Sequence, residues 1–183
     1  MNIHQLSVHH DERQDRLLLR LNTQDQQEFR FWLTRRMTLR LLPAIEKTAV
    51  RLESAQPGVA ATDAPAQHLL TELKRDAFFK EADFATPFDN HAKQWPLGAD
   101  PLLITDAHLT IKPGGALEMA FEDKSDAAQV KSCQLHLQVS LVHGMLHLIR
   151  QASEKAEWGS LGIPAIATEA SPVSTSEPPR YAH

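Results

Sequence analysis

The feature that most constrains the fold is a change of hydrophobic period between Ser132 and Trp158. Apolar residues occupy every second position of Ser132–Ser140, which is typical of a strand with one buried face. From Leu141 onward they recur with the period of an α-helix, and Gly159 is suited to end that helix. The segment therefore predicts a strand that passes directly into an amphipathic helix, whose apolar side packs on the sheet.

The same order of patterns occurs near the beginning of the chain. Arg16–Asn22 and Gln27–Leu33 both alternate, and the polar TQDQ between them predicts a hairpin. Ile3–His10 is a weaker candidate for a preceding strand. Arg35–Glu53 has helical periodicity, and Pro43 within it is expected to kink the helix or to divide it in two.

Two further candidate strands, 101–111 and 116–122, precede the strand of the opening segment. Residues 1–53 and 101–158 thus both read β-β-β-α, although no residue identity links them. We expect an α+β domain with an antiparallel sheet of about six strands built from the two units, and long helices packed on one face. The alternative is that each unit curls round its own helix.

The predicted organisation is one domain over residues 1–158 with a disordered tail over 159–183, which is rich in Ser, Thr, Pro and Ala. Residues 54–100 form a linker and an extra helix between the two units. Within them, Phe78–Trp95 holds five of the eleven aromatic residues. Such a segment either covers an edge of the core or forms an exposed docking patch.

Composition limits the kind of partner. The net charge of −4 and a pI near 6.2 argue against general binding to nucleic acid or anionic membranes. The charge is uneven, because nine Lys/Arg against six Asp/Glu between Asp11 and Arg51 give +3 there and −7 elsewhere. One cysteine excludes an internal disulfide, and no apolar run has the length of a signal peptide or a membrane span. We expect a soluble cytoplasmic protein.

Ten histidines raise the question of a metal site. His143 and His147 have the spacing of helical zinc ligands, but the glutamate of the HExxH motif is missing. Cys133 and His136 lie nearby, yet their opposite parity on one strand directs them to opposite faces. The chain also lacks a nucleophile elbow, a phosphate-binding glycine loop and a dinucleotide fingerprint. We therefore predict a non-enzymatic protein without metal or cofactor.

Single-stranded nucleic acid is the alternative partner. Arginine and tryptophan side chains on the outer face of the first strands would suit stacking and phosphate contacts. The order of elements also resembles that of Whirly and PUR domains, which implies binding of single strands. The matching face of the second unit is acidic or neutral, however, which interrupts the basic track.

Binding of a protein partner, or of a second copy of the chain, explains more of these features. It accounts for the unequal charge, the aromatic segment and a polar helix stripe that ends in Trp158, which serves either as an anchor or as a cover for the last strand. Self-association is the simplest form of it, because open sheet edges invite pairing. The contact residues we predict are Arg16, Arg20, Arg30 and Trp32 on the sheet and His143, His147, Arg150 and Trp158 on the helix.

Overall fold

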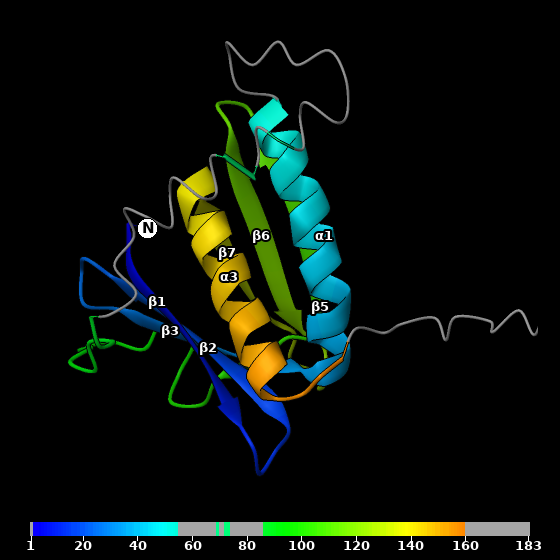
Figure 1. The fold of residues 1–183 in the computed structure, drawn as a ribbon. Helices are drawn as coiled ribbons and strands as arrows, with labels where there is room; N and C mark the ends of the chain where they lie inside the picture. Colours follow the sequence, from blue (N-terminus) through cyan, green and yellow to red (C-terminus); the bar gives the residue numbers. More distant parts are fainter. Residues whose placement is uncertain (1, 55–68, 70–71, 74–85, 160–183) are drawn as a thin grey trace, which may run out of the picture.

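A computed structural model describes residues 2–54, 69, 72–73 and 86–159 of the chain. The predicted tail from residue 160 onward, the linker after residue 54 and most of the extra helix lie outside the described residues. These residues form two small sheets and two α-helices. The helices lie side by side (Figure 1). In chain order the elements are β1 Ile3–Asp11, β2 Arg16–Thr23, β3 Glu28–Thr34, α1 Arg35–Ser54, β4 Leu102–Leu103, β5 Asp106–Lys112, β6 Ala116–Asp123, β7 Lys131–Leu137 and α3 Val139–Lys155.

The first sheet has the order β1-β2-β3-β4 and contains the predicted hairpin. β2 and β3 pair in antiparallel register, with Leu19 opposite Phe31 and Arg20 opposite Arg30. The alternation of the sequence is confirmed, since every residue predicted to face inward on these two strands is buried. Those residues are Leu17, Leu19, Leu21, Phe29, Phe31 and Leu33.

The second sheet has the order β5-β6-β7, so the prediction of a single six-stranded sheet is wrong. The predicted strand 101–111 is divided, because its backbone changes partners. The Ile104 amide donates to the Trp32 carbonyl in the first sheet, and the Thr105 amide donates to the Glu122 carbonyl in the second, both at 2.9 Å. The α+β class itself is confirmed.

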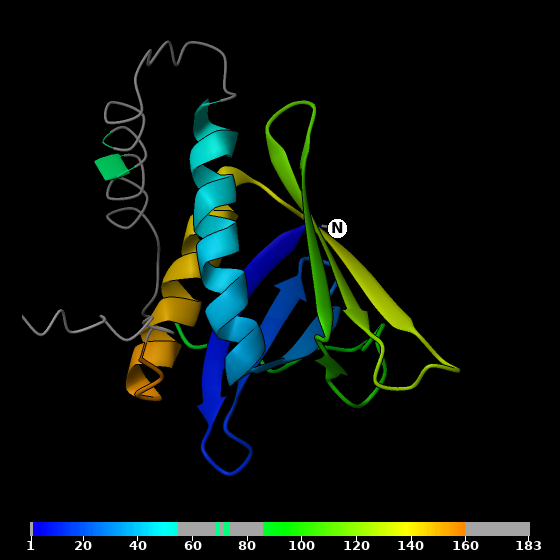
Figure 2. The same ribbon diagram turned by 90° about the vertical axis from the view of Figure 1, so that its right-hand side faces the viewer.

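Both helices lie on the same side of the two sheets, which Figure 2 shows from the edge. They have 20 and 17 residues, so they are of ordinary length rather than long. α1 continues through Pro43 as one helix, and the prediction of two pieces is wrong. Pro43 has no N–H to donate to the carbonyl of Leu39, and Leu39 is only half-buried, so that carbonyl can bond water instead.

The end of α3 differs from the prediction in a way that places Trp158. Glu157 adopts the left-handed conformation, with φ 54°, in place of Gly159. The amide of Trp158 then bonds the carbonyl of Ser153, and that of Glu157 bonds the carbonyl of Glu154. This Schellman arrangement turns the chain back toward the first unit directly after the helix.

One core serves both sheets. The Phe31 and Phe121 rings, from the inner faces of the two sheets, meet edge to face with centroids 5.2 Å apart. The buried apolar residues of the helices and of both sheets form one continuous cluster. Among the described residues, no helix combines the length and apolar character needed to cross a membrane.

Candidate interaction surfaces

The outer face of the first sheet, where Arg20 lies, is covered by residues 86–99 of the same chain. The Arg20 side chain donates to the Glu28 carboxylate at 2.7 Å and to the Asn90 side chain at 2.8 Å. Its guanidinium also lies 4.2 Å from the centre of the Phe88 ring. Arg20 is therefore half-buried and fixes the covering segment, as a cation–π contact and a charge-assisted bond together would.

Arg30 is engaged in the same way one strand further along. Its guanidinium lies 5.9 Å from the centre of the Trp95 ring and donates to the carbonyl of Ala99. The Trp95 indole in turn donates to Glu28, which is only 4% exposed. For Phe88 and Trp95, the covering interpretation of the aromatic segment is the one that fits, although Trp95 keeps 47% of its surface exposed. Phe78, Phe79 and Phe84 lie outside the described residues.

Arg16 and Trp32 lie on this outer face as predicted and are half-buried. Arg16 is opposite Asp11 on β1 and Thr34 on β3. Trp32 is opposite Leu18 on β2 and Leu103 on β4. Of the four predicted sheet residues, the structure thus brings Arg20 and Arg30 into intramolecular contacts with a covering segment.

His143, on the polar stripe of α3, is buried against α1, so its expected outward orientation is wrong. α3 lies antiparallel to α1, and His143 is 4% exposed with its Nε2 at 2.6 Å from Oε1 of Glu53. Two turns along the same line, Arg150 forms an ion pair with Glu46, and both side chains keep nearly half of their surface exposed. His147 lies between these two pairs and is half-buried. His143 and Arg150 therefore each match a carboxylate on α1.

Trp158 is also buried, at 5% exposure, and its expected outward position is wrong. Its indole nitrogen donates to the Asp15 carboxylate at 2.6 Å, and its ring meets the His10 ring edge to face. The hydrogen bond from Trp158 is the largest of the effects that lower the pKa of Asp15. Trp158 thus packs against the β1–β2 turn of the first unit.

The histidines and the cysteine do not converge on a metal site. Cys133 faces the core, while His136 faces outward and contacts Glu118 at 2.9 Å, which confirms that their strand parity separates them. Burial raises the pKa of the Cys133 thiol to about 11. Across the part of the chain that the structure describes, no group of three or more His, Cys, Asp or Glu side chains is placed to bind a metal ion.

The outer face of the second sheet remains accessible. Its exposed residues include His108 and Thr110 on β5 and Gln134 and His136 on β7. Glu118 on β6 is held between Lys112 and His136, each at 2.9 Å. Within residues 2–54 and 86–159, β7 pairs with β6 alone, so its other edge has no strand partner there.

Sequence reasoning missed the carboxylates that pair with α3 and a polar pocket on the first sheet. Glu46 and Glu53 are seven residues apart on α1, as His143 and Arg150 are on α3, and this matched spacing is a signal that could have found them. The pocket joins Asn22 to residues 89–92, and no local pattern connects them. No protein-family model, curated protein or solved structure matches the chain.

Proposed function

We propose that the chain is a non-enzymatic interaction module that associates with a second copy of itself through the edge of β7. The observation that carries this proposal is the regularity of that edge. β7 pairs with β6 in unbroken register from Lys131 to Leu137. It contains no proline, and Lys131 is its one residue with a Lys, Arg, Asp or Glu side chain. Proline and charged side chains are the devices that natural edge strands use to prevent pairing, and β7 has only Lys131 of this kind.

Self-pairing about Gln134 suits the residues that would meet. In an antiparallel arrangement centred on Gln134, Cys133 lies opposite Leu135 of the second copy, and both belong to the buried face. Ser132 lies opposite His136, and Lys131 lies opposite Leu137, so no two like charges meet. The two three-stranded sheets would then form one sheet of six strands across a two-fold axis.

Other surfaces support the choice of β7 indirectly. Arg20 and Arg30 bond acceptors of their own chain, and the α3 stripe faces α1. We therefore do not extend the proposal to nucleic acid. Val130, directly before β7, exposes 55% of its surface, and in the proposed pairing it lies beside Gln138 of the second copy. Its burial there adds an apolar contribution to association.

The test is the oligomeric state of the full chain and of a charge variant, measured by sedimentation velocity. Gln134→Lys places two lysines opposite each other at the axis, on an exposed face where the fold tolerates them, and should shift the protein toward monomer. Thr110→Lys is the matched control, with the same charge change on the same face two strands away. A wild-type monomer at concentrations of about 1 mM, which corresponds to a binding free energy weaker than about −4 kcal/mol, contradicts the proposal. Equal dissociation of both variants contradicts it as well.

A further inference from the structure

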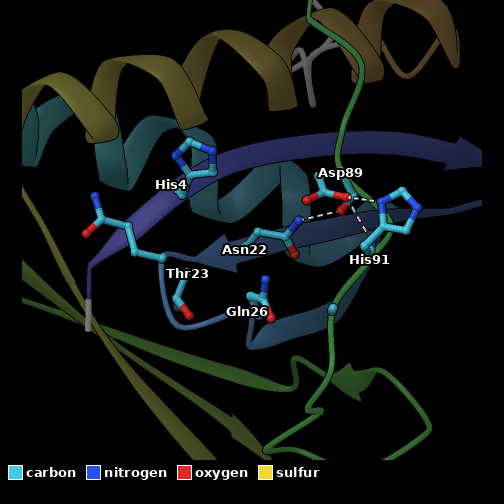
Figure 3. A pocket seen from close by; sticks show the side chains of 8 residues that line it. His4, Asn22, Thr23, Gln26, Asp89 and His91 are labelled. Atoms are coloured by element: carbon cyan, nitrogen blue, oxygen red, sulfur yellow. Dashed lines mark hydrogen bonds and ion pairs between the residues drawn. The ribbon is translucent and has the colours of Figure 1, made fainter.

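A polar pocket of ≈ 320 Å³ lies at one end of the first sheet. It forms where the start of β1, the β2–β3 turn and the segment that covers the sheet meet (Figure 3). Its size lies at the lower end of the range for small-molecule sites. The side chains that line it include His4, Asn22, Thr23, Gln26, Asp89 and His91.

Asn22 contributes a buried acceptor that lacks a donor. The residue is 6% exposed, and its Nδ2 donates to the main-chain carbonyl of Asp89 at 2.5 Å. A carbonyl can only accept, so the orientation of the amide is fixed and Oδ1 points the other way. Oδ1 is buried and has no hydrogen-bond partner. Such a group costs about 1–3 kcal/mol when unsatisfied, which a donor from a bound molecule would recover.

Asp89 supplies the charge of the pocket. Its Oδ1 accepts from the His91 amide at 2.9 Å and lies 2.6 Å from Nδ1 of the same residue. These two bonds, the main-chain one first, lower the pKa of Asp89. Among the described lining residues, Asp89 is the one Asp, Glu, Lys or Arg, so the pocket combines an anionic group with a neutral acceptor.

We propose that this pocket binds a small molecule that carries a guanidinium group. A guanidinium presents several N–H donors in one plane, so it can serve the Asp89 carboxylate and Oδ1 of Asn22 at the same time. Its positive charge matches the carboxylate, and charge-assisted bonds of this kind are the strong ones. A metal ion fits less well, because no metal-binding group occurs among the described residues. This inference is independent of association through β7.

The experiment follows the amide resonances of the ¹⁵N-labelled full chain during titration with methylguanidinium. Shifts confined to residues 22–26 and 89–92 are expected. N-methylurea, which has nearly the same shape without the charge, should give none, and methylammonium, which lacks the planar fork, should bind more weakly. Asp89→Asn should weaken methylguanidinium binding at least about fivefold, since it removes the charge from the hydrogen bond. Asp25→Asn makes the same charge change on the β2–β3 turn, at a residue outside the pocket lining, and should leave binding within about twofold.

Asn22→Leu removes the orphan acceptor and should abolish the shifts, provided that its circular dichroism matches wild type. If that variant does not fold, the wild-type titration and the Asp89→Asn variant still decide. Absent or scattered shifts with methylguanidinium overturn the site. Equal binding of N-methylurea or methylammonium overturns the assignment to a guanidinium. An equal effect of Asp25→Asn and Asp89→Asn shows attraction to net charge alone and also overturns it.

Discussion

Replacing His143 with leucine should destabilise the fold strongly, because it leaves a buried carboxylate without its partner. Glu53 is 1% exposed, and its Oε1 lies 2.6 Å from His143. Its second oxygen, Oε2, is already buried without a hydrogen-bond partner. Removing one member of such a pair costs about 3–5 kcal/mol of the free energy of unfolding.

Thermal and urea denaturation, followed by circular dichroism, measure that loss. For a domain of this size each kcal/mol lowers Tm by about 2–4 °C, so His143→Leu should lower it by about 6–20 °C. Glu46→Gln is the matched control on the same helix interface. Its ion pair with Arg150 leaves both side chains nearly half exposed, so the loss should be at most about 1 kcal/mol.

A double variant separates the loss of the pair from the loss of packing. His143→Leu with Glu53→Leu replaces both partners by apolar side chains, and it should recover most of the stability that the single change loses. A loss below about 1 kcal/mol for His143→Leu, or one no larger than that of Glu46→Gln, would refute the idea that this pair is a buried link between the helices.

Three further predictions concern other contacts. Because burial raises the pKa of Cys133 to about 11, Ellman's reagent should label it only after denaturant is added, and rapid labelling of the native protein would contradict its buried position. The hydrogen bond from Trp158 lowers the pKa of Asp15 in the folded protein below its ordinary value of 3.8. The stability that this bond contributes is therefore present above pH 3.8 and is lost as the pH falls through the pKa of the folded state. Trp158→Phe removes this bond, so Tm of the variant should fall less than Tm of the wild type when the pH is lowered. An identical pH dependence of Tm in both proteins would argue against this role of the bond. Arg20→Gln should speed amide hydrogen exchange in residues 86–99 before it does so in β7, whereas unchanged exchange there would show that Arg20 does not fix the segment.

The strands and helices could be predicted because their signal is local. The parity of Leu17, Leu19 and Leu21 assigns them to one face whatever the rest of the chain does. The division into two sheets could not be predicted in this way. It depends on the hydrogen bonds of Ile104 and Thr105, whose partners lie 72 and 17 residues away in the sequence.

The predicted contact residues show a similar limit. A polar helix stripe such as that of His143 and Arg150 usually indicates a face exposed to solvent, unless a second helix presents matching carboxylates to it. The partner of His143 is Glu53, 90 residues earlier, so the pattern of α3 alone could not reveal it. Likewise, the alternation of β2 places Arg20 on the outer face of the sheet, but it cannot show that this face is covered, because the covering segment begins 66 residues later. The sequence pattern thus identifies the polar positions of a strand or helix, whereas the partners of these residues depend on tertiary packing.

Mixing two charge variants at the β7 edge tests the central proposal most directly. Gln134→Lys and Gln134→Glu should each be monomeric alone, because like charges then meet at the two-fold axis. In an equimolar mixture lysine lies opposite glutamate, so a dimer containing one chain of each kind should form and sediment faster than either variant. A mixture that sediments as the average of two monomers, while the wild-type protein dimerises, would contradict pairing through β7.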